Sequence, residues 1–272
     1  MCPIVYISVV SNYTVQIPIY NLWIGIGLIA GFWGFDLYTK NENKHYIDHV
    51  FYYLAASILI GFILSNRVDE ILLTRKISSA FDFSRFTGIT VMPGLMFGVI
   101  TLLALLKINN YPLLYTLNLI CPFVCLAHGF GRIGCFFAGC CFGTPTALPI
   151  GILFPSDSPA SLKLGPNTPV HPTQIYSSIF LFILFFILII YIRVNYRLCF
   201  YLYAYGIFRF FIEYLRGDYR GEFSGLDYFS PAQIFSVVFV IIAIILYLKT
   251  KQPFQSNLKE TQCLAQGHPE QR

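Results

Sequence analysis

Residues 128–143, HGFGRIGCFFAGCCFG, concentrate polar and reactive side chains in an otherwise apolar chain. The stretch holds one arginine, one histidine, three cysteines and five glycines. An unpaired charge at membrane depth costs about 3 kcal/mol on insertion scales, so Arg132 needs a polar partner or a ligand. Glycines let the backbone approach a bulky group closely. The stretch therefore predicts that Arg132 binds an anion inside a membrane or at its edge.

The composition supports a membrane environment. Of 272 residues, 56% are hydrophobic and only 11% are charged, against about a quarter charged in a soluble domain. The aromatic share of 18% suits a lipid-facing surface with Tyr at the interfaces. No basic patch interleaved with aromatic residues accompanies the net charge of +5, so nucleic acid is excluded as a partner. The N-terminal residues lack the basic region of a cleaved signal peptide.

Seven stretches are apolar and long enough to be spanning helices, which need about 20 residues. They cover residues 19–38, 49–65, 88–106, 113–130, 173–192, 198–215 and 231–247. The predicted fold class is an all-α integral membrane protein with one membrane domain, residues 1–248, and a polar tail, residues 249–272. A Gly/Pro-rich irregular segment, residues 130–172, is expected between the fourth and fifth helices.

The distribution of Lys and Arg predicts the orientation, because cytoplasmic loops are enriched in both. Residues 1–18 carry neither, whereas residues 249–272 carry four. An odd number of spans then places the N-terminus outside, the tail in the cytoplasm and residues 130–172 on the extracytoplasmic side. The connection at residues 66–87 has basic residues on the outer side, against this rule, and is interpreted as an amphipathic surface segment.

A second charged island, YGIFRFFIEYLRGDYR, occupies residues 205–220. Tyr205, Arg209, Glu213 and Arg216 are spaced by four, four and three residues, so they share one helix face. One interpretation is an Arg209–Glu213 pair with Arg216 reaching the interface. The favoured one is that these arginines bind one phosphate together with Arg132, because arginine is a bidentate phosphate ligand. It predicts guanidinium groups of Arg132 and Arg209 within roughly 12 Å.

Three further positions have a structural and a functional interpretation. In HPTQIYSS, His171 forms a turn and Gln174 either secures the loop or hydrogen-bonds a ligand. Tyr20, early in the first span, is by default an interfacial anchor. Ser230 and Gln233 are typical of a helix N-cap and its early-turn partner.

Four motifs in order, GRIG at 131–134, HPTQIY at 171–176, YGxxRxxxExxR at 205–216 and SPAQ at 230–233, resemble the prolipoprotein diacylglyceryl transferase family. The resemblance implies a bacterial inner-membrane enzyme that works at the outer leaflet. Members move the diacylglyceryl group of phosphatidylglycerol onto the lipobox cysteine thiol of a preprolipoprotein, and they release glycerol 1-phosphate. No metal or organic cofactor is implied.

The resemblance also implies roles for individual residues. Arg132, Arg209 and Arg216 would bind the phosphate, and Glu213 would orient an arginine. Tyr20 and Tyr205 would position the headgroup. The substrate-binding set would further include Gly143, His171 and Gln174. An elongated cavity that opens sideways to lipid is expected near the arginines.

The chain departs from the family pattern GRxGNFxNxE, because Cys135, Ala138 and Cys140 replace the two Asn and the Glu. The family's His-Gly-Gly is replaced around MPGL, residues 92–95, and the acid that commonly follows HPxQxY is Ser177. Residues that hold phosphate are retained, while polar residues near the thiol chemistry are lost. Two rival functions follow, a transferase of the same fold with another acceptor and a non-catalytic lipid-binding protein.

Cys135, Cys140 and Cys141 have four interpretations. With His128 they would complete a three-sulfur, one-nitrogen zinc site, although the C-x4-C-C spacing is unusual for zinc. A disulfide would link Cys135 to either neighbour. A nucleophilic thiolate stabilised by Arg132 would give a covalent lipid relay. Inert packing is the favoured account, and no metal is predicted.

Overall fold

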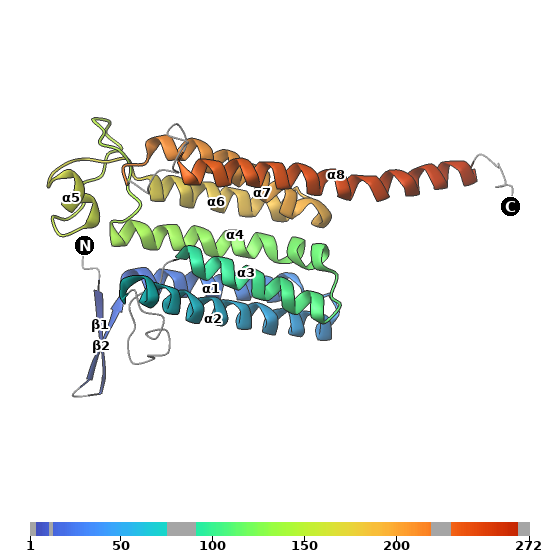
Figure 1. The fold of residues 1–272 in the computed structure, drawn as a ribbon, viewed down its shortest axis with the longest axis horizontal. Helices are drawn as coiled ribbons and strands as arrows, with labels where there is room; N and C mark the ends of the chain where they lie inside the picture. Colours follow the sequence, from blue (N-terminus) through green and yellow to red (C-terminus); the bar gives the residue numbers. More distant parts are fainter. Residues whose placement is uncertain (1–3, 11–12, 75–90, 219–229, 266–272) are drawn as a thin grey trace. The chain divides into compact units, whose positions relative to one another are not determined.

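The computed structural model describes residues 4–10, 13–74, 91–218 and 230–265 (Figure 1). A two-stranded antiparallel hairpin comes first, and helices follow to the end of the described chain. The strands are β1 Ile4–Val10 and β2 Tyr13–Pro18. The helices are α1 Ile19–Tyr38, α2 Lys44–Thr74, α3 Val91–Ile108, α4 Leu113–Ala138, α5 Pro159–Leu164, α6 Thr173–Ile190, α7 Arg197–Ile212 and α8 Pro231–Ala265. Two 3-10 turns, η2 Val194–Tyr196 and η3 Glu213–Leu215, flank α7.

The helical, multi-pass character of the chain is confirmed. Among the described residues, five helices are long and apolar enough to span a bilayer: Lys44–Val68, Leu113–Ala138, Thr173–Ile190, Val194–Leu215 and Pro231–Lys251. A helix also lies at each of the two other predicted spans. Of these, α1 is outside the set of five, and the apolar part of α3, Pro93–Ile108, is shorter. A total of seven spans therefore remains a prediction.

The difference from the predicted elements that matters most for the site lies in the Arg132 stretch. Helix α4 does not end near residue 130 but continues to Ala138, so Arg132 and Cys135 project from a helix. In an apolar environment a helix satisfies its own backbone hydrogen bonds, and this outweighs the weak helix preference of Gly. The irregular segment begins only at Gly139 and contains the short helix α5.

Both ends of the chain also differ from expectation. The hairpin β1–β2 was not predicted, although residues 4–10 and 13–18 are rich in β-branched side chains. At the other end, α8 extends the last span into the polar tail as far as Ala265. Most of the charged connection at residues 66–87 lies outside the described residues.

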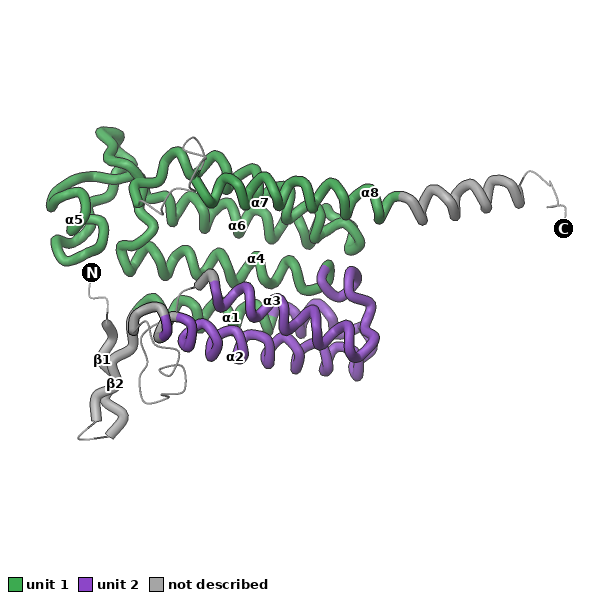
Figure 2. Tube along the Cα trace, viewed as in Figure 1, with its two compact units in different colours: residues 1–33, 118–272 green, residues 34–117 purple. Residues whose placement is uncertain are grey.

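The chain divides into two compact units, residues 1–33 with 118–272 and residues 34–117 (Figure 2). In the unit of residues 34–117, α2 and α3 pack closely through glycines. A Cβ on Gly61 would lie 2.5 Å from the carbonyl oxygen of Gly94 and 3.0 Å from the nitrogen of Gly98. Small residues allow such close helix contact in a bilayer, where apolar surface alone gives little driving force.

The other unit, which we call the site unit, contains every predicted site residue. Its helices approach at small residues as well. A Cβ on Gly27 of α1 would lie 2.8 Å from Cβ of Phe130 in α4, and the Ser178 hydroxyl of α6 donates to the Gly129 carbonyl at 3.0 Å. These contacts bring α1 and α6 against the same part of α4, directly before Arg132.

Candidate functional site

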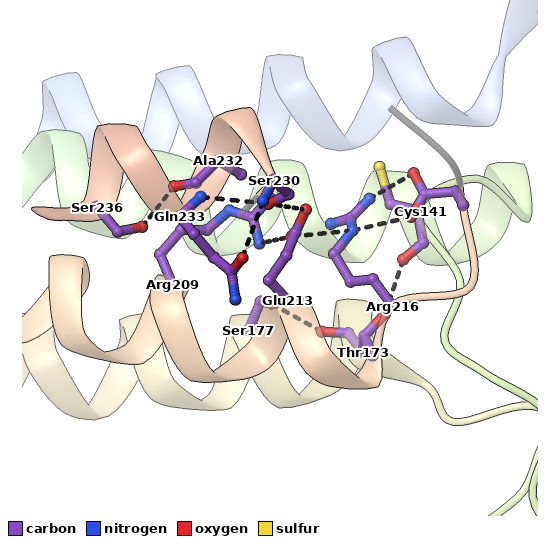
Figure 3. A network of polar contacts seen from close by, with 11 residues as sticks. Cys141, Thr173, Ser177, Arg209, Glu213, Arg216, Ser230, Ala232, Gln233 and Ser236 are labelled. Carbon is purple, nitrogen blue, oxygen red and sulfur yellow. Dashed lines mark hydrogen bonds and ion pairs between the residues drawn. The ribbon is translucent and has the colours of Figure 1, made fainter. Parts of the chain in front are cut away.

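Buried polar side chains gather where α7 ends (Figure 3). Arg209 near the end of α7, Glu213 in η3 and Arg216 just after it lie beside the first turns of α6 and α8. The predicted common face of these residues thus exists, although α7 tightens into a 3-10 turn at Glu213. The turn places Arg216 after the helix proper, in extended backbone.

Glu213 joins both arginines. Arg209 Nη1 donates to Glu213 Oε2 at 2.5 Å, and Arg216 Nε lies 3.8 Å from the same oxygen. The Ser230 hydroxyl donates to Glu213 Oε1 at 3.0 Å. Arg209 is only 9% exposed, so its charge is expensive to bury without a partner. The carboxylate therefore fixes the position of Arg209 and draws in Arg216.

The predicted N-cap of the last helix is present. The Gln233 N–H donates to Ser230 Oγ at 3.3 Å, and the Ser230 N–H donates to Gln233 Oε1 at 2.9 Å. This reciprocal pair is a capping box. Since Ser230 also binds Glu213, the cap ties α8 to the arginine cluster.

Arg216 has a second acidic partner. Its Nε and Nη2 donate to the two carboxylate oxygens of Asp218 at 2.8 and 2.6 Å. Burial by itself disfavours the charged guanidinium, but Asp218 and a hydrogen bond with Cys141 raise the pKa of Arg216 above its usual value. Arg216 is thus permanently charged, and an incoming phosphate would compete with Asp218 for it.

Arg132 meets the cluster from α4. Its Nε donates to His128 Nε2 at 3.3 Å, and its guanidinium hydrogen-bonds Tyr205 of α7. The His128 and Tyr205 rings meet edge to face, with centroids 5.3 Å apart. The charges of Arg132 and Arg209 both act on the His128 imidazole. Both arginines, far apart in sequence, thus act electrostatically on one imidazole, and the binding of one anion by the two remains a prediction.

Tyr20 reaches the site because α1 lies close to α4 at Gly134. A Cβ on Gly134 would lie 3.1 Å from the Tyr20 carbonyl oxygen and 3.2 Å from its ring. The Tyr20 phenol is near Arg132, Cys135 and Cys140. This placement brings the Tyr20 phenol beside the cysteines and Arg132, and its contact with substrate remains a prediction.

Gly143 and His171 hold the loop together. The Gly143 N–H donates to the His171 carbonyl at 3.0 Å, and the His171 N–H donates to the Thr144 carbonyl at 3.0 Å. Gly143 also pairs with Arg216 in an isolated antiparallel bridge. The His171 Nδ1 lies 3.3 Å from the Tyr176 hydroxyl. These contacts favour the structural interpretation of both residues, and contact with substrate remains a prediction.

Gly143→Ala should damage the site through its backbone. The added Cβ would lie 2.5 Å from the His171 carbonyl oxygen and 2.7 Å from that of Leu215, so three backbone segments would have to separate. We expect a loss of thermal stability and of activity together, worth about 1 to 3 kcal/mol of unfolding free energy. Gly131→Ala is the matched control, since its Cβ would meet nothing within 4 Å. Equal melting temperatures of the two variants in detergent would contradict this account.

The three cysteines form a compact cluster. The sulfur atoms of Cys135, Cys140 and Cys141 all lie within 4.8 Å of one another. These three are free thiols, and so are Cys121, Cys125 and Cys199. His128 is not part of the cluster and faces Arg132 instead, so the three-sulfur, one-nitrogen ligand set, one of the four interpretations, is not assembled. The reason is that His128 and Arg132 both lie on α4, one helical turn apart, so the imidazole contacts the arginine.

The backbone at Cys140 and Cys141 is held in an unusual shape by α6. Cys141 has φ +61°, in the left-handed region. Its carbonyl accepts from Thr173 Oγ1 at 2.7 Å, and the Cys140 carbonyl accepts from Gln174 Nε2 at 2.7 Å. Gln174 is only 1% exposed, so it secures the cysteine turn rather than facing open solvent.

The pKa values of the Cys140 and Cys141 thiols are shifted in opposite directions. Hydrogen bonds from Cys135 and Cys140, followed by the positive charges of Arg216 and Arg132, lower the pKa of the Cys141 thiol. Hydrogen bonds with Cys135 and Cys141 raise the pKa of the Cys140 thiol. The positive charges of Arg216 and Arg132 thus favour the ionised form of Cys141.

A cavity of about 180 Å³ lies next to the cluster, at the end of α4. Phe137 to Gly139 line one side, and Phe154 and Asp157 are among the residues on the other. The arginines do not line it. The elongated, lipid-facing cavity expected at the arginines therefore remains a prediction.

Two contributors escaped the sequence analysis. Asp218 lies inside the quoted island but was given no role. Both of its carboxylate oxygens accept hydrogen bonds from Arg216. Thr173 holds the Cys141 carbonyl. The R-x-D spacing at Arg216 was a usable signal for the first, whereas nothing local marks Thr173 as a partner of a residue 32 positions away.

The fold and site define a multi-pass membrane protein with buried arginines clustered beside thiols. The sequence model of the family described as prolipoprotein diacylglyceryl transferase matches residues 8–249. This chain therefore belongs to the prolipoprotein diacylglyceryl transferase family.

Individual relatives agree with the family match. A phosphatidylglycerol–prolipoprotein diacylglyceryl transferase of Clostridium tetani is 37% identical over 237 residues, which cover 84% of this chain and 91% of the relative. A second such transferase, of Clostridium perfringens, is 34% identical and covers 86% and 91%. One from a Wolbachia of Brugia malayi is 30% identical and covers 89% and 93%. The similarity thus covers at least 84% of this chain for each of the three relatives.

Proposed function

We propose that this chain transfers the diacylglyceryl group of phosphatidylglycerol to the lipobox cysteine of preprolipoproteins and releases glycerol 1-phosphate. The observation that carries the proposal is that the charges of Arg132 and Arg209 both act on His128, with Arg216 joined to Arg209 through Glu213. Arginines bind phosphate through paired N–H groups. The three arginines carry three positive charges, and Glu213 and Asp218 carry two negative ones, so one positive charge remains for an anionic headgroup.

In the proposed reaction a thiolate sulfur attacks the glyceryl carbon next to the phosphate. A sulfur–carbon bond forms and the carbon–oxygen bond to phosphate breaks. The phosphodiester carries one negative charge before the reaction, and the phosphate monoester that leaves carries two, because the thiol has already released its proton. Negative charge grows on the phosphate in the transition state. Arg132 and Arg209 would lower the barrier by stabilising that charge more strongly than the ground state.

The other site residues have supporting roles in this scheme. Glu213 orients Arg209, and Arg216 would exchange its contact with Asp218 for the phosphate. Tyr205, held by Arg132, and Tyr20 would position the headgroup. Gly143, His171 and Gln174 keep the loop and the cysteine turn in place around the substrate.

The membrane placement belongs to the same proposal. We place the chain in the bacterial inner membrane, with seven spans, an outer N-terminus and a cytoplasmic tail. The arginine cluster and the loop after α4 would then face the extracytoplasmic side, where the lipobox cysteine of an exported precursor arrives.

The test is a transfer assay with purified protein, phosphatidylglycerol labelled in its acyl chains and a lipobox peptide. Label on the peptide, lost when its cysteine is replaced by serine, supports the proposal. No labelled peptide with an intact, folded protein would overturn it. Because Cys135 and Cys140 replace polar residues of the family pattern, a small-molecule thiol is included as a second acceptor. Transfer to that thiol alone would favour the same-fold transferase with another acceptor.

A further inference from the structure

The three-thiol cluster has a geometry that packing does not explain. Adjacent residues in extended chain direct their side chains to opposite faces, yet the sulfurs of Cys140 and Cys141 lie on one side with that of Cys135. The left-handed backbone of Cys141 allows this. Such a conformation costs a residue with a side chain about 1 kcal/mol or more. Apolar packing of the cysteine side chains does not require this conformation and does not offset its cost.

Two side chains of α6 maintain the turn. Thr173 and Gln174 donate to the carbonyls of Cys141 and Cys140, one to each. Both donors are buried, and both belong to consecutive residues of the first turn of α6. Thr173 and Gln174 therefore hold the backbone of the two cysteines in place, as outer residues do when they orient metal ligands.

The sulfur positions suit a thiophilic cation. Zinc binds thiolates at about 2.3 Å, so tetrahedral sulfurs lie about 3.8 Å apart. The three sulfurs, all within 4.8 Å of one another, reach this separation by small side-chain adjustments. Three thiolates and Zn²⁺ carry a net charge of −1, and the charges of Arg132 and Arg216 act on this cluster. The neighbouring arginines thus offset the charge of the loaded site.

A covalent lipid relay fits the chemistry less well. Attack by a cluster thiolate on the glyceryl carbon would give a dialkyl thioether, whose sulfur is a poor leaving group. The second transfer, to the peptide thiol, would then stall. A catalytic zinc site instead keeps an open fourth position, and a thiol that binds zinc loses its proton outright.

We propose that Cys135, Cys140 and Cys141 form an open zinc site whose fourth position binds the acceptor thiol as a thiolate. The metal site rests on this geometry alone, and the identity of the acceptor rests on the proposed function. The acceptor proton goes to water when its sulfur binds the metal. That sulfur then forms the bond to the glyceryl carbon, the carbon–oxygen bond breaks towards phosphate, and the neutral thioether product leaves the metal as a weaker ligand. The cluster thus supplies the ionised nucleophile that the transfer requires.

The first test measures metal without activity. Purified full-length protein, stripped and titrated with Co²⁺ as a spectroscopic substitute for zinc, should bind about one ion per chain and give the sulfur-to-cobalt and tetrahedral bands of a thiolate site. Cys135→Ser, Cys140→Ser and Cys141→Ser should each weaken binding by at least about 100-fold, and Thr173→Val by about 10-fold. Cys199→Ala, at a buried position of α7, is the matched control and should bind like the unaltered protein. Absent thiolate bands, or an equal loss in Cys199→Ala, would overturn the site.

The second test addresses the fourth position. A lipobox peptide should shift the cobalt spectrum, and its serine version should not. Chelated protein should lose transfer and regain it with Zn²⁺. Full transfer by metal-free protein, or no spectral response to the peptide thiol, would overturn the role of the site. A normal spectral response without any transfer from phosphatidylglycerol would leave the site standing and refute the proposed function instead.

Discussion

Arg209→Lys is expected to reduce diacylglyceryl transfer at least about 100-fold, equivalent to about 2.7 kcal/mol of transition-state stabilisation. Arg209 binds Glu213 through one nitrogen of a planar fork, and the fork is what permits simultaneous contact with a carboxylate and a phosphate. A lysine ammonium keeps the charge but offers a single point of contact. Initial rates with labelled phosphatidylglycerol and lipobox peptide measure the effect.

The control for Arg209→Lys is Arg193→Lys, which makes the same change at an exposed position between α6 and α7. It should leave the rate within about twofold, since exposed charges contribute little. Melting temperatures of both variants separate loss of chemistry from loss of fold. Retention of full activity by Arg209→Lys would refute phosphate binding by its fork and leave Arg209 only a structural partner of Glu213.

The helices could be predicted because a helix that spans a bilayer needs a minimum length of apolar sequence. A single polar residue does not hide so long an apolar stretch. The start of α4 and that of α6 agree with the predicted ones. The end of α4 could not be located, because the glycines of residues 128–143 favour a loop in water. Only the apolar surroundings of residues 131–138 keep the helix intact.

The site was predictable where its members lie on one helix. The spacing of Arg209 and Glu213 gave their contact directly. Contacts across helices, such as Ser230 with Glu213 and Gln174 with Cys140, depend on how α6, α7 and α8 pack. Local sequence has no information on that packing. Gln174 accordingly had two open interpretations, and only the fold showed which carbonyl it holds.

The family pattern and the structure differ most at the cysteines. Where the pattern has an acid, Cys140 lies in a turn held by Gln174 and beside two further thiols. Losing that acid removes a negative charge near the arginines, which favours anion binding, but it also removes a hydrogen-bond acceptor for the thiol chemistry. A set of three cysteines restores negative charge only when its thiols ionise or bind a cation. The negative charge of the cysteine set thus depends on ionisation or on a bound cation, whereas a carboxylate is permanently charged.

Glu213→Gln is expected to lower kcat by at least about 30-fold while KM for phosphatidylglycerol stays constant or falls. The change removes the one carboxylate that joins Arg209 and Arg216, so the site becomes more positive and attracts the phosphate more strongly. The arginines are then less well placed for the charge that develops in the transition state. Separate kcat and KM values from phosphatidylglycerol titrations give the measurement.

Ser230→Ala is the graded comparison for Glu213→Gln, because it removes the hydrogen bond to Glu213 Oε1, together with the N-cap bond from the Gln233 N–H, and leaves the carboxylate charge. Loss of one such bond costs about 0.5 to 1.5 kcal/mol, so kcat should fall by about 2- to 10-fold. A merely structural Glu213 would lower the amount of folded protein without separating kcat from KM. An unchanged kcat with a raised KM would mean that Glu213 contributes equally to ground state and transition state, and the positioning role would then be wrong.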